Sequence, residues 1–221
     1  FVGTELTGKT LGIIGCGNIG SIVADRAQGL KMKVAAFDPY LTEERAESIG
    51  VRKLELKPLL ADSDFISLHT PLTEQTKNII NAEALAAMKK GVRIINCARG
   101  GLISEQDLKA ALEDGHVAGA ALDVFSEEPA TNNILFGAPG VIATPHLGAS
   151  TMEAQEKVAL QIAEQMSDFA GKWNSRDIKG SQSELFWQIV PDGEVNFDLT
   201  FSENQLEYVF TSDKIVLNPL G

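Results

Sequence analysis

The chain has 221 residues, of which 44% are hydrophobic and 22% charged, close to the average of folded soluble proteins. Wholesale disorder is therefore excluded. The 19 basic and 30 acidic residues give a formal net charge of −11, which disfavours binding to nucleic acid and to anionic membranes. No apolar run approaches the ~18 residues of a membrane span, and the first residues do not resemble a secretory signal. Cys16 and Cys97 form no disulfide or zinc pattern, which favours a reducing cytoplasm and no metal site.

The first motif along the chain is Gly3-Thr4-Glu5-Leu6-Thr7-Gly8-Lys9-Thr10, which matches the phosphate-binding pattern G-x-x-x-x-G-K-[ST]. A working loop of this kind follows a strand and opens a helix, so that the helix N-terminus faces the phosphates. Here an apolar run, Leu11–Ile14, follows the motif instead. We interpret the segment as a polar approach to the first strand. An ATP or GTP site that depends on Lys9 is the alternative.

A second glycine motif, Gly15-Cys16-Gly17-Asn18-Ile19-Gly20, directly follows the strand predicted at Leu11–Ile14 and opens a helix predicted at Ile19–Leu30. In this context G-x-G-x-x-G is typical of dinucleotide binding. The first glycine allows the tight turn, the second lets a pyrophosphate approach the backbone, and the third lets the helix pack closely on the sheet.

Asp38 follows the second predicted strand, Val34–Phe37, and lies 18 residues after Gly20. A carboxylate at this place accepts hydrogen bonds from the adenosine ribose hydroxyls and repels a 2′-phosphate. The next residues, Pro39 and Tyr40, supply no arginine to compensate. The sequence therefore predicts NAD rather than NADP as the cofactor.

The same alternation of apolar runs and helical patterns continues toward the C-terminus. Continuous apolar runs are typical of strands that are buried on both faces, and alternating strands and helices predict a parallel sheet with right-handed crossovers. The expected fold is α/β, a doubly wound Rossmann-type sheet. The further strands are predicted at Phe65–Leu68, Val92–Ile95, Ala118–Val124 and Val141–Ala143, and the helices between them at Ala82–Met88 and Glu105–Glu113.

Three side chains of catalytic type follow the ends of predicted strands. Arg99 comes after Val92–Ile95, Glu128 after Ala118–Val124, and His146 after Val141–Ala143. Ligands of open α/β sheets bind outside the carboxyl ends of the strands. A guanidinium can hold a carboxylate, an imidazole can exchange the hydroxyl proton, and a carboxylate can orient the imidazole. The set predicts hydride transfer to or from a hydroxy acid.

The end of the chain has a different composition. Half of the 14 aromatic residues lie after residue 170, while all three histidines lie before it. After a long helix predicted at Thr151–Ala170, three strand-like runs predict a β-rich tail of unknown role with a boundary near Gly171-Lys172. The expected division is a crossover at 1–10, a cofactor-binding domain at 11–170 and the tail at 171–221. The predicted tail strands are Leu185–Val190, Val195–Phe201 and Leu206–Phe210.

Residues 4–170 resemble the nucleotide-binding domain of the D-isomer-specific 2-hydroxyacid dehydrogenases. The motifs that carry the resemblance are Gly15–Gly20, Asp38, Asn96–Gly101, Asp123–Pro129 and Thr144–Gly148. Within the family, the segment His146–Gln155 looks most like the members that oxidise 3-phosphoglycerate in serine biosynthesis. In the family, the substrate domain is built mostly from chain that precedes this segment.

The resemblance implies that Arg99 binds the substrate, that His146 is the acid–base and that Glu128 is its partner. It implies that Asp123 lies near the nicotinamide carboxamide, that the partner is a 2-hydroxy or 2-oxo acid, and that the chain forms a homodimer or a higher homo-oligomer. Two alternatives stay open: a non-catalytic NAD(H)-binding sensor or corepressor-like module, and a glyoxylate/hydroxypyruvate or D-lactate type reductase. The expected cofactor-binding residues are Gly15, Gly17, Asn18, Ile19, Gly20, Asp38, His69, Thr70, Pro71, Cys97, Ala98, Asp123 and Gly148.

Overall fold

The computed structural model describes residues 3–148, 150–154, 156–158 and 160–162, together with four strands between residues 185 and 219. The chain forms two compact units, Phe1–Gln155 and Glu156–Gly221. The boundary predicted near Gly171-Lys172 lies outside the described residues.

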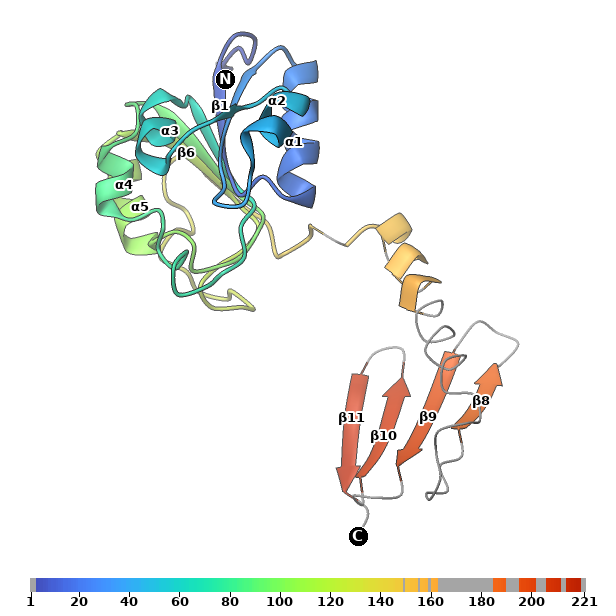
Figure 1. The fold of residues 1–221 in the computed structure, drawn as a ribbon. Coiled ribbons are helices and arrows are strands. Elements are labelled where there is room, and N and C mark those ends of the chain that lie inside the picture. Colours follow the sequence, from blue (N-terminus) through green and yellow to red (C-terminus); the bar gives the residue numbers. More distant parts are fainter. Residues whose placement is uncertain are drawn as a thin grey trace. The chain divides into compact units, whose positions relative to one another are not determined.

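The first unit is built on a seven-stranded sheet in which every pairing is parallel (Figure 1). Its strand order is β3-β2-β1-β4-β5-β6-β7, so the direction of winding reverses between β1 and β4. This confirms the predicted doubly wound fold. The strands are β1 Thr10–Ile14, β2 Lys33–Phe37, β3 Arg52–Lys53, β4 Phe65–Leu68, β5 Val92–Asn96, β6 Val117–Leu122 and β7 Val141–Ala143.

Helices cover both faces of this sheet. The sheet separates the buried residues into two clusters, one under each layer of helices. One cluster of buried residues includes Ala24 and Ala27 of α1, and the other includes Leu59 of α3, Leu85 of α4 and Leu108 of α5. In Figure 1, α1 and α2 lie on one side of the sheet, and α3, α4 and α5 lie on the other. The helices are α1 Asn18–Gly29, α2 Glu43–Ser48, α3 Leu56–Asp62, α4 Ala82–Ala86 and α5 Glu105–Glu113.

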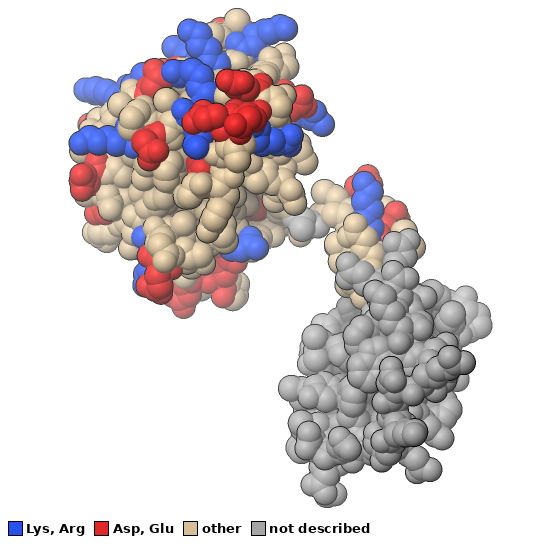
Figure 2. Space-filling model, in the orientation of Figure 1, with Lys and Arg blue, Asp and Glu red and all other residues tan. Residues whose placement is uncertain are grey.

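Short polar side chains begin three of these helices, as helix termini require. Thr42 accepts from the Arg45 N–H at α2, and Asn81 accepts from the Ala84 N–H at α4. Ser104 accepts from the Asp107 N–H at α5. No described helix has the length and apolar character needed to cross a bilayer. In Figure 2, basic and acidic side chains lie together over the upper part of this unit, acidic ones gather at its lower end, and the surface between is mostly uncharged.

The P-loop-like motif Gly3–Thr10 does not have the structure that its sequence pattern requires. Its last residue, Thr10, is the first residue of β1, and no helix follows the motif directly. A turn at Gly8 (φ 77°) brings the chain into the strand, and the Gly8 N–H donates to Lys31 O. Among the described residues a strand, and not a helix, follows the motif, so the strand–loop–helix arrangement that an ATP or GTP site at Lys9 requires is not present here.

In the second unit, residues after 184 form a four-stranded antiparallel sheet in the order β11-β10-β9-β8. The three predicted strands are present, and a fourth, β11, was not predicted. Residues 152–154, 156–158 and 160–162 are helical and lie within the helix predicted at Thr151–Ala170, whose residues 163–170 are outside the described part. The tail strands are β8 Leu185–Ile189, β9 Val195–Phe201, β10 Leu206–Thr211 and β11 Lys214–Pro219.

Asp64 connects three elements at the amino edge of the parallel sheet. Its carboxylate accepts from the Thr10 N–H (2.8 Å) and from Lys89 Nζ (3.2 Å). Partial burial raises the pKa of Asp64, but the hydrogen bonds from Thr10 and Lys89 outweigh it, so the pKa lies below its usual value. The charged form of Asp64 therefore stabilises the fold.

We expect Asp64→Asn to lower the free energy of unfolding near neutral pH by about 1–2 kcal/mol, because hydrogen bonds to a charged acceptor are lost. A depressed carboxyl pKa contributes stability above the unfolded value of about 4, and this contribution disappears as the pH falls through the folded value. Urea unfolding at pH ~7 and pH ~3 measures this, and the difference in unfolding free energy between the parent and Asp64→Asn should be smaller at the lower pH. Asp62→Asn is the control, because Asp62 pairs with Arg52 at the surface and such pairs contribute little. If Asp64→Asn and Asp62→Asn lost the same unfolding free energy, this role of Asp64 would be contradicted.

Candidate active site

The loop between β1 and α1 contains the glycine motif and lies at the carboxyl edge of the sheet, where the winding reverses. Gly15 has a φ of 90°, and a Cβ there would lie 2.7 Å from the His69 carbonyl. A Cβ on Gly20 would lie 2.1 Å from Gly15 O. A Cβ on Gly17 would meet nothing within 4 Å. Gly15 and Gly20 are thus required by packing, whereas Gly17 faces open space.

The open space at Gly17 adjoins the N-terminus of α1. Gly17 is the N-cap, no side chain caps the helix, and its first turn contains no acidic residue. The free N–H groups and the helix dipole make such an end an anion site. The residues present therefore fit the diphosphate of a dinucleotide, with Asn18 and Ile19 in the first turn.

Asp38 lies half-buried just after β2 and holds the glycine loop. Its Oδ2 accepts from the Cys16 N–H and its Oδ1 from the Tyr40 N–H, each at 2.8 Å. An ionised carboxylate has about four acceptor positions, so capacity for ribose hydroxyls is left over. The prediction identified Asp38 but not its bond to the glycine loop.

The segment His69-Thr70-Pro71 follows β4 and packs against the glycine loop. The His69 N–H donates to Ile14 O at 2.7 Å, and the backbone of His69 and Thr70 lies against Gly15. The ring Nε2 is 2.9 Å from Ser67 Oγ, and burial lowers the pKa of His69. Cofactor binding by His69, Thr70 and Pro71 stays a prediction. Ser67 was not predicted.

The turn after β5 is closed by buried Asn96. Its Nδ2 donates to Arg99 O (2.9 Å) and its Oδ1 accepts from the Ala98 N–H (3.0 Å). Arg99 is exposed, and its Nη1 donates to Ala98 O at 2.6 Å. Burial and the charge of Asp123 raise the pKa of the Cys97 thiol, so Cys97 is a poor nucleophile.

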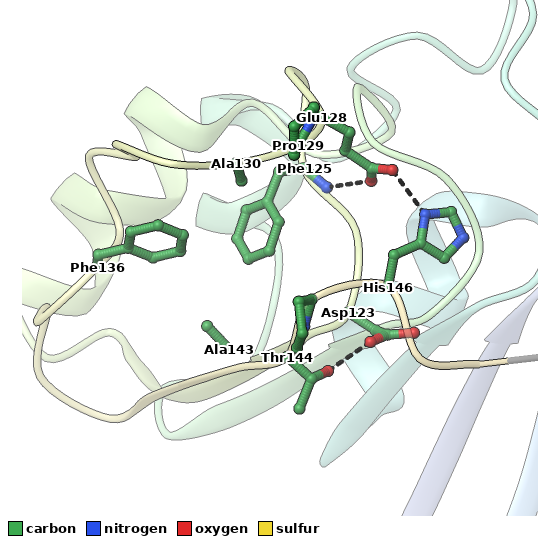
Figure 3. A pocket seen from close by; sticks show the side chains of 10 residues that line it. Asp123, Phe125, Glu128, Pro129, Ala130, Phe136, Ala143, Thr144 and His146 are labelled. Atoms are coloured by element: carbon green, nitrogen blue, oxygen red, sulfur yellow. Dashed lines mark hydrogen bonds and ion pairs between the residues drawn. The ribbon is translucent and has the colours of Figure 1, made fainter. Parts of the chain in front are cut away.

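Glu128 and His146, from the loops after β6 and β7, form a hydrogen-bonded pair (Figure 3). His146 Nδ1 lies 2.6 Å from Glu128 Oε2, and Glu128 Oε1 accepts from the Phe125 N–H at 3.0 Å. The hydrogen bond from the Phe125 N–H has the larger effect and the one with His146 the next largest, and both lower the pKa of Glu128. The His146 side chain is 50% exposed and the Glu128 side chain 33% exposed, so a ligand can reach the imidazole. With Nδ1 facing the carboxylate, Nε2 is the atom free to exchange a proton.

Buried Asp123 holds the loop that carries His146, whose φ is 57°. Its Oδ1 accepts from Thr144 Oγ1 (2.5 Å) and from the Leu147 N–H (2.8 Å), and its Oδ2 accepts from the Gly148 N–H (2.9 Å). Burial raises the pKa of Asp123, but these hydrogen bonds and nearby His146 outweigh it, so the pKa is lowered. The carboxylate therefore fixes the backbone on both sides of the imidazole.

The predicted catalytic residues lie at one edge of the sheet, but only two of them touch. Within the described residues, Arg99 makes no hydrogen bond or ion pair with Glu128 or His146. A cavity of about 520 Å³ adjoins the Glu128–His146 pair. The prediction missed its aromatic lining as well as Thr144. The cavity is lined by Asp123, Phe125, Glu128, Pro129, Ala130, Phe136, Ala143, Thr144, Pro145 and His146.

The fold and this edge define the class of protein: a doubly wound, Rossmann-type domain with a hydrogen-bonded glutamate–histidine pair at the carboxyl edge of its sheet. Residues 1–148 match the family described as D-isomer specific 2-hydroxyacid dehydrogenase, NAD binding domain. The chain belongs to that family and carries its NAD-binding domain, which confirms the expected family and cofactor.

Similar proteins agree with this assignment. D-3-phosphoglycerate dehydrogenase from Bacillus subtilis (strain 168) is 58% identical over 170 residues, which are 77% of this chain and 32% of that protein. The Synechocystis enzyme of the same name is 52% identical over 168 residues, 76% of this chain and 30% of that protein. The chain thus spans about a third of the length of these relatives.

Solved structures of the family have the same fold. A glyoxylate reductase from Paecilomyes thermophila is 40% identical with a TM-score of 0.68, and the match covers 72% of this chain and 48% of that one. A D-lactate dehydrogenase from Aquifex aeolicus, in complex with NAD and lactic acid, is 33% identical with a TM-score of 0.71. That match covers 77% of this chain and 56% of that one.

Proposed function

We propose that this chain is the cofactor-binding and acid–base part of an NAD-dependent oxidoreductase that acts on D-2-hydroxy acids. The substrate that we favour is 3-phosphoglycerate, which is oxidised to 3-phosphohydroxypyruvate in serine biosynthesis. The observation that carries the proposal is the Glu128–His146 pair, 2.6 Å apart, at the same sheet edge as the N-terminus of α1, which no side chain caps. The identity of 58% to a phosphoglycerate dehydrogenase supports this substrate over glyoxylate or D-lactate.

In the proposed mechanism, bound NAD supplies the acceptor for the hydride that leaves the carbon bearing the hydroxyl group. His146 Nε2 takes the hydroxyl proton as the carbonyl forms, and Glu128 orients the ring and stabilises its positive charge. Arg99 binds the substrate carboxylate with two parallel hydrogen bonds. In the reverse direction, His146 returns the proton to the carbonyl oxygen.

The cofactor preference follows from Asp38. Its carboxylate accepts ribose hydroxyls and repels a 2′-phosphate, so the full chain should bind NADH more tightly than NADPH. Fluorescence titrations with NADH and NADPH test this preference, and a titration with ATP tests the alternative of a nucleotide site at Lys9. By the family resemblance, we also propose a homodimer in the cytoplasm, and light scattering of the purified chain would test the dimer.

A chimera tests the reaction. The matching 170-residue segment of the Bacillus subtilis relative is replaced by that of this chain, and NADH formation is followed with 3-phosphoglycerate, D-lactate and glycolate. We expect turnover that is fastest with 3-phosphoglycerate. NADH binding by the unmodified chain, combined with a folded chimera that turns over none of these acids, would favour a non-catalytic NAD(H)-binding module instead.

A further inference from the structure

The segment that carries Glu128 has little regular structure of its own. Residues 123–140, between β6 and β7, contain no helix or strand, and residues 126–129 are exposed. Exposed loops open locally at low free energy unless side chains hold them. The geometry of the Glu128–His146 pair therefore depends on the contacts that hold this loop.

Glu105, the first residue of α5, makes two of these contacts. Its Oε1 accepts from the Ser126 N–H at 2.8 Å, and its Oε2 accepts from Asn133 Nδ2 at 2.9 Å. These partners lie 21 and 28 residues away in sequence, one on each side of Glu128. One half-buried carboxylate thus holds both ends of the short segment that carries Glu128.

The two contacts continue into the core and into the Glu128–His146 pair. Asn133 Oδ1 accepts from the Leu135 N–H at 2.9 Å, and Leu135 is fully buried. Ser126 directly follows Phe125, which is 5% exposed and donates its N–H to Glu128 Oε1 at 3.0 Å. The peptide group that Glu105 holds at Ser126 therefore directly follows the one that orients Glu128.

We propose that Glu105 is a positioning residue: through Ser126 and Asn133 it holds the 126–133 segment so that Glu128 meets His146. This rests on the proposed acid–base function of the pair. A carboxylate suits the task because it offers acceptors to two donors at once, and its charge is favourable in the first turn of α5. A glutamine has only one acceptor oxygen and presents an amide to the second donor.

A neighbouring residue separates this role from simple stabilisation of α5. Asp107 lies in the same helical turn, and its Oδ2 accepts from the Ala82 N–H at 3.0 Å, away from the 126–133 segment. Asp107→Asn therefore removes a first-turn charge without touching the loop, and it is the matched control for Glu105→Gln.

The test uses the full chain with two readouts that need no turnover: amide hydrogen exchange at Ser126, and the pH titration of the Glu128 side-chain carboxyl by NMR. In Glu105→Gln we expect exchange at Ser126 to be at least about tenfold faster. We also expect the pKa of Glu128 to rise toward its usual value as its donors disengage. Asp107→Asn should move neither quantity. Asn133→Ala, on the exposed loop, should reproduce part of both effects if Glu105→Gln does not fold.

In the chimera, Glu105→Gln should lower kcat about tenfold and leave NADH affinity unchanged, because misplacing a catalytic group by ~1 Å can cost up to ~100-fold. Unchanged exchange at Ser126 and an unchanged Glu128 titration in a folded variant would overturn the proposal. Changes in both readouts without any turnover in the parent chimera would instead contradict the proposed function and leave the positioning by Glu105 in place.

Discussion

Replacing His146 with alanine is expected to lower the rate of hydride transfer by about 10²–10⁴-fold, the usual contribution of general acid–base catalysis. The imidazole is half-exposed and paired with Glu128 at 2.6 Å, so its free Nε2 is the group placed to exchange a proton with substrate. The measurement is kcat with 3-phosphoglycerate in the chimera described above, with the NADH dissociation constant determined in parallel.

The control for this prediction is a second histidine that the structure uses differently. His116 lies just before β6, at the opposite edge of the sheet, and its Nε2 is 2.9 Å from Leu85 O. His116→Ala should leave kcat within about threefold of the parent, because it touches no part of the proposed chemistry. If His146→Ala lowered kcat by less than about threefold, the acid–base role of His146 would be refuted, since such a loss is smaller than acid–base catalysis usually contributes.

Sequence reasoning predicted the strand, glycine turn and helix at the start of the sheet because the signal there is local. The order of strand, glycine turn and helix is contiguous from Thr10 to Gly29, and Asp38 follows the next strand. Each of these features has a steric or electrostatic reason that can be stated for a short segment. Arg99, Glu128 and His146 could be predicted to lie at one edge of the sheet, because each follows the end of a buried parallel strand and such strands share a carboxyl edge.

The contacts that hold the site could not be predicted, because they join distant residues of ordinary type. Thr144 reaches Asp123 across 21 positions, and Glu105 reaches Asn133 across 28. Neither pair has a recognisable spacing, and an acid in the first turn of a helix is common for reasons unrelated to a loop. The same contacts explain an error in a boundary. The strand predicted at Ala118–Val124 ends at Leu122, where Asp123 turns to bind the β7 loop.

The two-residue strand β3 shows a different limit. Arg52 and Lys53 pair with Ala35 and Ala36 of β2, yet a basic dipeptide has neither an apolar run nor an alternation that predicts a strand. Its position at the edge of the sheet makes the charged side chains reasonable, since edge strands often carry lysine. Tertiary pairing, rather than local preference, determines this element.

Gly17→Val is expected to weaken NADH binding by at least about 100-fold, or ~2.7 kcal/mol. A side chain on Gly17 would fill the space in front of the α1 N-terminus and keep a diphosphate from the free N–H groups. The melting temperature should hardly change, because a Cβ at this position meets nothing within 4 Å. The measurements are a fluorescence titration with NADH and a thermal melt of the full chain.

Two other glycines make this prediction specific to the N-terminus of α1. A Cβ on Gly3, in the P-loop-like motif, also meets nothing within 4 Å, so Gly3→Val should change neither stability nor NADH affinity. A Cβ on Gly20 would lie 2.1 Å from Gly15 O, so Gly20→Ala should lower the melting temperature as well as the affinity. If Gly17→Val kept the affinity of the parent within about threefold, less than 1 kcal/mol, the diphosphate could not lie at the N-terminus of α1. Binding of the cofactor would then have to rest on other predicted contacts, such as those of Asp38 and His69.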